Sequence, residues 1–378
     1  MSVEPRTSLR ELALLFLRLG ATAFGGPAAH IAMMEEHVVR RRGWMTREHY
    51  LDLIGAANLI PGPNSTEIAI HVGYARRGVP GLVIAGVCFI VPAMVLTGAL
   101  GWAYVRYGTR PEASWLMYGI KPVIIAIVAQ ALWNLGRTAL KSWWLGAIGA
   151  GAFAAVALGV NELLVLGAAG ALAAARVAGA RPRGSAAWFG PLAPLAGGSA
   201  AATSFGLAPL FLTFLKIGAV LFGSGYVLIA FLRADFVERL HWLTESQLLD
   251  SVAAGQITPG PVFTTATFIG YVLAGPTGAL VATAGIFLPA FVFVAISGPL
   301  VPRIRRSPIA GAVLDGVKVA SLALMAVVAI ELGRASLVDA PTIALAAVAA
   351  VLLVRFRVGS LWLVALGAIV GLARMFVG

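Results

Sequence analysis

The stretch from Val79 to Val105 contains no charged residue, and it is long enough to cross a membrane as a helix. The hydrocarbon core of a bilayer requires about 20 predominantly apolar helical residues. Similar runs recur along the chain, which is 60% hydrophobic and only 12% charged, whereas soluble domains carry about 25% charged residues. Because the runs are continuous and do not alternate with polar residues, they indicate helices and not barrel strands. The sequence predicts an all-α polytopic membrane protein whose main partner surface is the lipid bilayer.

The basic residues gather in short clusters between the apolar runs. The formal net charge is +12, and clusters such as Arg40-Arg41-Arg42 have the pattern of cytoplasmic loops under the positive-inside rule. A nucleic-acid partner is therefore not expected. The single cysteine, Cys88, lies inside an apolar run, which argues against a disulfide framework and a thiolate metal cluster. We expect no cofactor and no metal site.

One polar, turn-forming stretch, Asn58 to Glu67, interrupts the apolar sequence at Pro61-Gly62-Pro63. Proline lacks a backbone N–H and glycine tolerates unusual dihedral angles, so an incoming helix should end here. Asn64, Ser65 and Thr66 are good capping residues, which predicts that a new helix begins directly afterwards. The free N–H groups and the positive dipole end of that helix would form an anion site at membrane depth.

The chain repeats itself. At an offset of 198 residues, Pro61-Gly62-Pro63 aligns with Pro259-Gly260-Pro261, and Asp52 aligns with Asp250; at an offset of 197, Lys121 aligns with Lys318. We therefore predict two homologous halves, residues 1–178 and 205–378, joined by a linker at 179–204. Paired broken or re-entrant helices in two halves indicate a transporter's binding site.

Charge suggests how the halves are oriented. The turn after the first motif carries Arg76-Arg77, whereas the equivalent turn near Leu273 is uncharged. One loop later the bias reverses, because Arg303-Ile304-Arg305-Arg306 is denser than Arg106 and Arg110. This swap favours inverted-topology halves over parallel ones. The number of spans stays open.

The motifs resemble those of the chromate ion transporter (CHR) family, long two-domain type. The resemblance is carried by Phe24-Gly25-Gly26-Pro27, His30-Ile31-Ala32-Met33-Met34, the stretch Asn58–Glu67, Gly223-Ser224-Gly225-Tyr226 and Thr258-Pro259-Gly260-Pro261, and covers nearly the whole chain. It implies a multi-pass protein of the bacterial plasma (inner) membrane that exports chromate and confers chromate resistance. It further implies that sulfate competes as the natural mimic.

Candidate site residues follow from the two motifs and the matched lysines. The substrate-binding candidates are Asn58, Pro61, Gly62, Pro63, Asn64, Ser65, Thr66, Gln256, Pro259, Gly260, Pro261, Thr264, Thr265, Lys121, Lys318, Gly25, Gly26, Gly223 and Gly225. We expect the hydroxyl and amide side chains to donate to the anion. The alternatives are that the Pro-Gly-Pro turns are packing kinks and that both lysines reach for lipid headgroups.

Proton coupling has its own candidates. Glu67 and His71 are four residues apart on one helix face, neither has an acidic or imidazole equivalent in the second half, and His30 lies near a Gly-Gly-Pro break. A structural pair is the alternative. Asp52 and Asp250 are expected to cap or orient the helices that enter the motifs. Gly367 and Gly371 form a small-xxx-small face that suits either a homodimer or intramolecular packing.

These observations predict a secondary transporter for a small divalent oxyanion, chromate by resemblance. No P-loop is present, so the membrane potential or a proton gradient would supply the energy. A sulfate or other oxyanion transporter or exchanger and an anion channel remain as alternatives. An enzyme is not expected, because the chain has no HExxH, no Gly-x-Ser-x-Gly and no cysteine pair.

Overall fold

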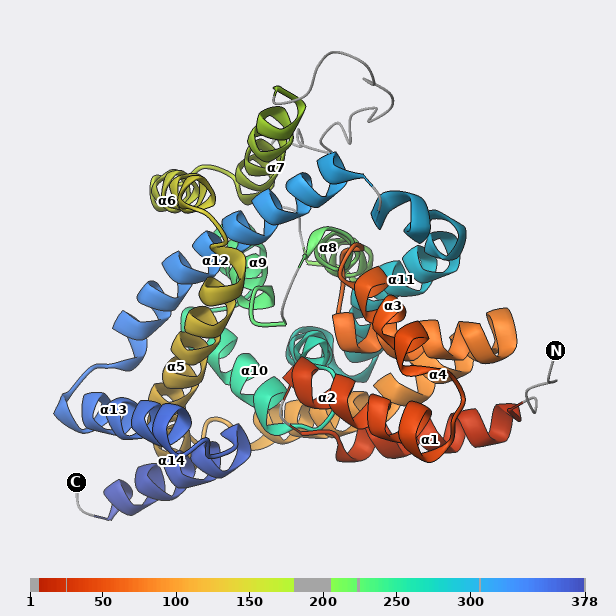
Figure 1. The fold of residues 1–378 in the computed structure, drawn as a ribbon. Helices are drawn as coiled ribbons and strands as arrows, with labels where there is room; N and C mark the ends of the chain where they lie inside the picture. The colour runs from red at the N-terminus through yellow and green to blue at the C-terminus, as the bar shows by residue number, and fades with distance from the viewer. Residues whose placement is uncertain (1–6, 25, 180–204, 223–224, 306, 377–378) are drawn as a thin grey trace.

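The computed structural model describes residues 7–24, 26–179, 205–222, 225–305 and 307–376 (Figure 1). All regular elements in these ranges are helices, which confirms the predicted all-α class. The elements up to residue 179 are α1 (Leu9–Thr22), α2 (Gly26–Glu35), η1 (Glu36–Arg41), α3 (Arg47–Ala57), α4 (Asn64–Tyr107), α5 (Pro111–Ala139), α6 (Trp143–Ala157) and α7 (Glu162–Gly179). Those after residue 205 are α8 (Leu207–Val220), α9 (Leu228–Leu232), η2 (Arg233–Arg239), α10 (Glu245–Ile257), η3 (Val262–Thr264), α11 (Thr265–Arg305), α12 (Pro308–Ser336), α13 (Ala340–Arg355) and α14 (Ser360–Met375).

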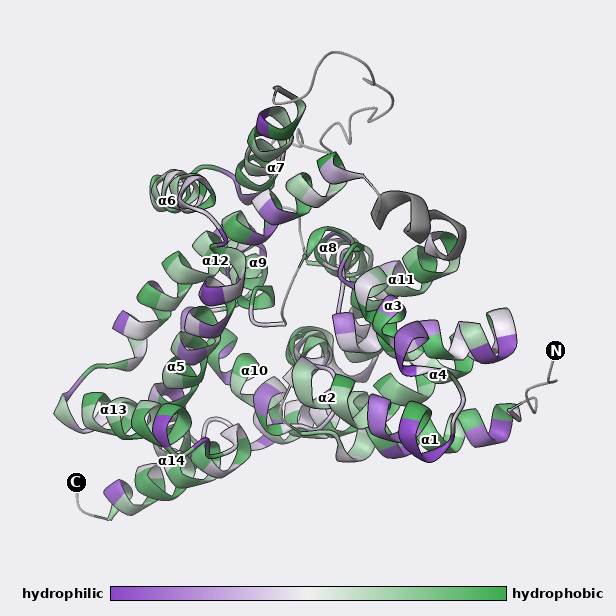
Figure 2. Ribbon diagram, in the orientation of Figure 1, coloured by the Kyte–Doolittle hydropathy of each residue, from purple (hydrophilic) through white to green (hydrophobic). Residues whose placement is uncertain are grey.

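Four helical segments are long and apolar enough to cross a membrane: α4, α5, the stretch Val262–Ser297, and α12. Figure 2 shows mostly apolar residues on the shorter helices α6, α13 and α14 as well. Large apolar side chains such as Trp133, Trp143 and Trp362 are more than two-thirds exposed, as expected for a surface that faces lipid. The chain is a multi-pass membrane protein.

Each of the longest helices, α4 and α11, folds back on itself near its start. Gly78 has φ 60° and ψ −144°, and its repeat equivalent Gly275 has φ 61° and ψ −152°. These dihedral angles are essentially restricted to glycine. After the reversal, Gly73 packs directly on Gly81, where a Cβ on either residue would collide with the other's carbonyl. The result is a helical hairpin with a short arm, 64–76 in α4, and a long arm that continues across the molecule.

The Pro-Gly-Pro turn lies at the far end of that short arm from the Gly78 reversal. Arg76, at the other end of the arm, donates to the carbonyl of Trp44, just before α3, at 2.5 Å. The beginning of α3 and the end of the short arm therefore lie together, so the two run antiparallel. The Pro-Gly-Pro turn is the tip of this second hairpin.

The two halves exchange their last helices. Helices α6 and α7 pack against α12 of the second half, whereas α13 and α14 pack against α5 of the first (Figure 1). The close approach needs small residues, because Gly119 of α5 has no room for a Cβ beside Gly367 and Gly371. The small-xxx-small face thus packs within the chain. The predicted linker lies outside the described residues apart from Gly179, and the domain boundaries stay a prediction.

Candidate functional site

Each of the two Pro-Gly-Pro turns is hydrogen-bonded to the other half of the chain, and the two bonds are reciprocal. The Gly62 N–H donates to the carbonyl of Leu221 at 2.8 Å, and the Gly260 N–H donates to the carbonyl of Ala23 at 2.9 Å. Each turn is therefore held by the end of the first helix of the other half. Both glycines have positive φ, 135° and 88°, a backbone conformation that other residues rarely adopt.

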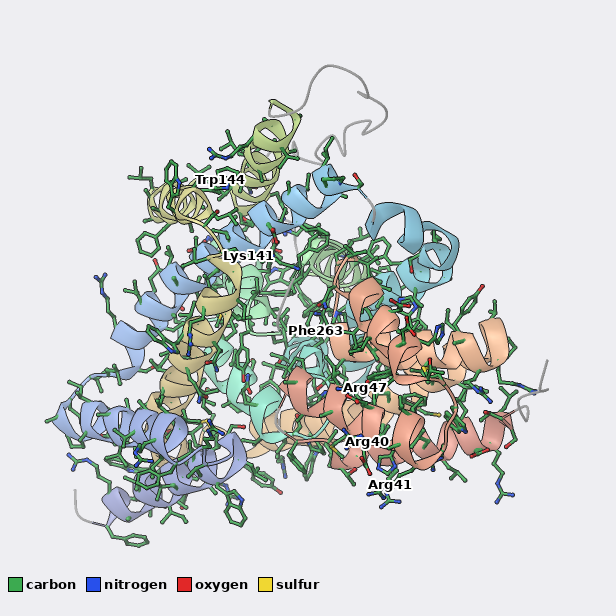
Figure 3. The ribbon with its side chains drawn as sticks, viewed as in Figure 1. Arg40, Arg41, Arg47, Lys141, Trp144 and Phe263 are labelled. Atoms are coloured by element: carbon green, nitrogen blue, oxygen red, sulfur yellow. The ribbon has the colours of Figure 1, made fainter. Side chains whose placement is uncertain are left out.

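A small void lies between the two tips. Its walls are formed by Pro27, His30, Pro63, Asn64, Ser65, Gly225, Pro261, Val262 and Phe263. Figure 3 labels Phe263 near the centre of the molecule, where α10 and the hairpins converge. The void measures about 10 Å³, which is room for about one water molecule. A tetrahedral oxyanion is larger, so it enters only if the tips separate.

Two helices start at this void. Within the described ranges, no backbone carbonyl accepts from the N–H groups of Asn64 and Ser65 in the first motif, or from those of Val262 and Phe263 in the second. Free N–H groups at the first turn of a helix, together with the helix dipole, favour anions. All four residues line the void. The tertiary structure therefore brings the two predicted helix N-termini to one place.

The side-chain donors at the tips are engaged within the protein. Ser65 Oγ lies 3.2 Å from Nδ1 of His30, whose Nε2 lies 3.0 Å from the carbonyl of Ala23. Because a carbonyl only accepts, His30 Nε2 carries a hydrogen. Asn64 donates to the Asn58 side chain at 2.8 Å. The hydroxyls of Thr264 and Thr265 donate to the carbonyls of Pro261 and Val262, both at 2.8 Å, so neither is available to an anion in this conformation.

A larger cavity of about 530 Å³ adjoins the void and shares Pro27 and Asn64 with it. Its polar lining consists of Asn58, Asn64, Gln130, Asn134, Thr138, Lys141, Tyr226, Asp315, Lys318 and Ser321. Lys141, labelled in Figure 3, forms an ion pair with Asp315 at 2.8 Å. Lys318 makes no ion pair within the described part of the chain. Two ammonium groups against one carboxylate give this cavity a positive balance, as an anion path requires.

Lys121 does not share that cavity. Its Nζ lies 3.2 Å from Oδ1 of Asp250 and donates to Ser246 Oγ at 2.6 Å, while the Tyr104 hydroxyl donates to Asp250 Oδ2 at 2.9 Å. The expectation that Asp250 caps its helix is wrong, because Thr244 is the N-cap of α10; that it orients the helix stays a prediction. The residue lies in the middle of α10 and bridges to α4 and α5.

Glu67 and His71 are buried behind the first tip. Glu67 is fully buried, and neither of its oxygens has a hydrogen-bond partner among the described residues; the same holds for Nε2 of His71 and Oγ1 of Thr66. The two side chains do not form the hydrogen-bonded pair that their spacing suggested. Glu67 Oε1 instead lies against Gly62, where it occupies the place of a Cβ.

The remaining predicted residues are placed as follows. Gly26 begins α2 with φ 75°, Gly225 lines the void, and the Gln256 side-chain nitrogen finds no partner within the described ranges. Gly25 and Gly223 lie outside the described residues.

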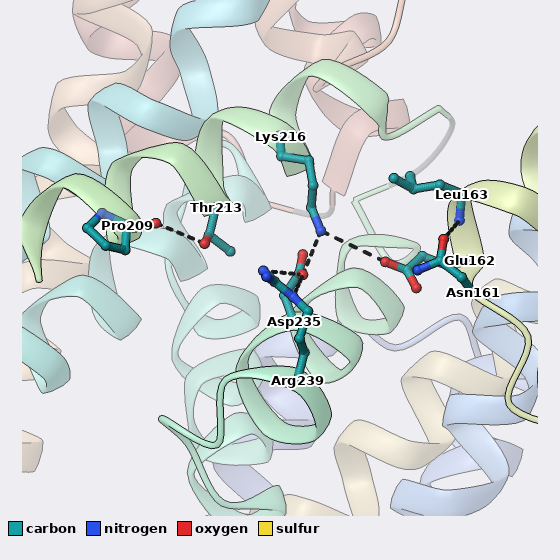
Figure 4. Close-up of polar contacts among 8 residues, drawn as sticks. All are labelled: Asn161, Glu162, Leu163, Pro209, Thr213, Lys216, Asp235 and Arg239. Carbon is teal, nitrogen blue, oxygen red and sulfur yellow. Dashed lines mark hydrogen bonds and ion pairs between the residues drawn. The ribbon is translucent and has the colours of Figure 1, made fainter. Parts of the chain in front are cut away.

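An ionic cluster that sequence reasoning missed lies beside α8 (Figure 4). The Asp235 carboxylate forms ion pairs with the Lys216 ammonium at 2.5 Å and the Arg239 guanidinium at 2.8 Å. The Lys216 ammonium also lies 3.9 Å from the carboxylate of Glu162 at the start of α7. The cluster ties η2 to α8 and α7. At the repeat offset of 198 residues, Lys216 aligns with Arg18, which marks a basic position in both halves but does not reveal its partners.

Comparison with known proteins identifies relatives along nearly the whole chain. The chromate transporter family model matches twice, at residues 10–175 and 208–372. A chromate transport protein from Cupriavidus metallidurans is 34% identical over 97% of this chain and 94% of its own length. One from Pseudomonas aeruginosa is 34% identical over 90% and 85%. An uncharacterized transporter from Bacillus subtilis is 30% identical over 35% of this chain and 74% of its own length.

No solved structure matches this chain. The repeated family match and the similarity over nearly the full length agree with the paired motifs seen in the fold. The chain belongs to the chromate transporter family.

Proposed function

We propose that this protein is a secondary transporter that exports chromate from the cytoplasm across the bacterial plasma membrane and so confers chromate resistance. The observation that carries the proposal is the meeting of two helix N-termini at one void beside the Lys318 cavity. Four unpaired N–H groups and two dipole ends attract a dianion without a fixed salt bridge. Such contacts suit a carrier, which must also release its substrate.

The closed state of the void favours a gated carrier over an open channel. The 530 Å³ cavity leads to tips that leave only about 10 Å³ between them. Transport then requires the hairpins to move apart and to close again, as in alternating access. The hairpins in which α3 leads to the first Pro-Gly-Pro turn and α10 to the second would be re-entrant. Helices α3 and α10 have 11 and 13 residues and span about 16–20 Å, well short of the roughly 30 Å hydrocarbon core.

The membrane potential is the proposed energy source. A negative-inside potential of 100 mV favours exit of an anion by roughly 2.3 kcal/mol per charge, and a dianion gains twice that amount. Sulfate is the second candidate substrate, because the same N–H groups and lysines recognise any tetrahedral dianion.

The test is uptake of radiolabelled chromate by inside-out vesicles or proteoliposomes, with sulfate as competitor. The variants Asn64→Pro and Lys318→Gln are each expected to lose most of the transport. Asn64→Pro removes one of the four N–H groups, and proline fits the first position of a helix that follows an extended residue. Thr213→Ala is the matched control, because its hydroxyl donates to Pro209 within α8, away from both cavities. Chromate movement that sulfate does not inhibit, or that survives in both variants, would contradict the proposed site. No chromate movement in the unaltered protein would refute the substrate.

A further inference from the structure

Two lysines at equivalent positions of the repeat have opposite surroundings. Lys318 of α12 lines the 530 Å³ cavity and makes no ion pair among the described residues. Lys121 of α5 is mostly buried, and its charge is matched by Asp250 of α10. The aspartate equivalent to Asp250 is Asp52, which is exposed and does not line the Lys318 cavity. One lysine is therefore open to an incoming anion, and the other is covered by a carboxylate.

The group around Asp250 has the composition of an oxyanion site. The Lys121 ammonium and the Tyr104 hydroxyl approach different oxygens of the carboxylate, at 3.2 and 2.9 Å, and the Ser246 hydroxyl contacts the same ammonium at 2.6 Å. Asp250 is only 6% exposed, and its Oδ1 receives no hydrogen bond with good geometry. An ammonium from α5 and a hydroxyl from α4 thus contact the carboxylate, and a hydroxyl from α10 contacts that ammonium.

We propose that Lys121, Tyr104 and Ser246 form a second oxyanion-binding site, which the Asp250 carboxylate occupies in this structure in place of the anion. This inference rests on the proposed function and extends it. A carboxylate and a tetrahedral oxyanion present similar acceptor oxygens, so the same donors serve both. A dianion that reaches Lys121 displaces Asp250, and α10 then moves with the second Pro-Gly-Pro tip, which follows it directly in the chain.

The Asp250 carboxylate keeps the charge of Lys121 paired when no substrate is bound. An unpaired buried charge is strongly destabilising, whereas a lysine that bound the substrate permanently would stop turnover. Asp250 neutralises Lys121 whenever the anion has left and competes with it when it returns. By repeat symmetry, Asp52 would cover Lys318 when the opposite cavity opens, so that the two lysines are exposed in turn.

The test uses the purified full-length protein in nanodiscs, with inorganic sulfate as the probe and binding measured by calorimetry. Lys318→Gln first removes the open site. Adding Asp250→Asn is expected to strengthen sulfate binding about tenfold or more relative to Lys318→Gln alone, because the anion can then contact the Lys121 ammonium. Adding Lys121→Gln should abolish the restored binding. Lys318→Gln/Asp52→Asn is the matched control and should gain nothing.

A second measurement reports on Lys121 directly. In the Asp250→Asn background, mass spectrometry should show faster acylation of Lys121 than in the unaltered protein, and sulfate should slow it again. Asp250→Ser provides the same test if the amide disturbs packing. A folded Asp250 variant without the gain, or a gain that persists in Lys121→Gln, would overturn the second site. If the unaltered protein moves no chromate while Asp250→Asn still restores sulfate binding through Lys121, the second site stands and only the proposed substrate is refuted.

Discussion

Glu67 stands out among the individual residues, because it is a carboxyl group fully buried at the centre of a membrane protein with no hydrogen-bond partner in the described ranges. An ionisable residue inside a membrane is a functional candidate by default. Its repeat equivalent is Thr265, so this carboxyl group has no counterpart in the second half. Its contact with Gly62 places it directly behind the first tip, where a change in its charge would act on the position of the turn.

If Glu67 couples protons to transport, Glu67→Gln should remove the effect of a pH gradient on chromate flux while sulfate binding persists. Flux is measured in proteoliposomes with and without an imposed pH gradient at constant membrane potential. Glu36→Gln is the control, since that residue is exposed on η1 and pairs with Arg41. An unchanged response to the gradient in Glu67→Gln would assign Glu67 a structural role.

At the scale of elements, the hairpin reversals at Gly78 and Gly275 determine where the tips lie. Without the reversal, the short arm and the long arm would be one straight helix of 44 residues in α4, about 66 Å long, and its first residue would lie far outside a bilayer. The reversal folds this excess back, and the tip stays at the level of the other half's tip. Open space surrounds both glycines, so the constraint is one of backbone conformation.

Gly78→Ala and Gly275→Ala are therefore each expected to destabilise the protein by about 1–3 kcal/mol through backbone strain alone. Thermal unfolding in detergent, followed by tryptophan fluorescence, measures the effect. Gly151→Ala is the control, because that glycine is helical with free space around it, and alanine there should be neutral or stabilising by up to about 1 kcal/mol. Equal stability of all three variants would show that the reversal tolerates a side chain.

Contacts that each half makes with the other hold the whole molecule together. Each half supplies the carbonyl that holds the other's tip and the last two helices that pack against a long helix of the other, α5 or α12. Each tip is therefore linked by a hydrogen bond to the end of α1 or α8 in the other half, so a displacement of one tip acts on the half that carries the other tip. This arrangement suits a carrier in which the two lysines are exposed in turn.

Inverted halves predict opposite labelling of equivalent surface positions. Arg42 and Leu240 are separated by the repeat offset and directly follow η1 and η2, respectively. In a Cys88→Ser background, Arg42→Cys and Leu240→Cys should react with an impermeant thiol reagent from opposite sides of sealed vesicles. Labelling of both cysteines from one side would establish parallel halves and exclude an inverted repeat.

The class of protein could be predicted from the amino-acid sequence alone, as could the matched motifs and the positions of the turns. Apolar runs leave few options other than membrane helices, and proline and glycine act through local backbone constraints that need no partner. Pro61-Gly62-Pro63 and Lys318 were accordingly recognisable as site candidates from the sequence. The matching of Asp52 with Asp250 marked these residues without revealing what they touch.

Which segments contact one another depends on the packing of the helices and could not be predicted from the sequence. The contacts of Asp250 with Lys121 and Tyr104, of Gly62 with Leu221, and of α13 and α14 with α5 join residues more than 100 positions apart. Such contacts depend on how whole helices pack, and small residues such as Gly119 permit many packings equally well. The sequence therefore specified the parts of a transport site, whereas the exchange of helices between the halves brought those parts together.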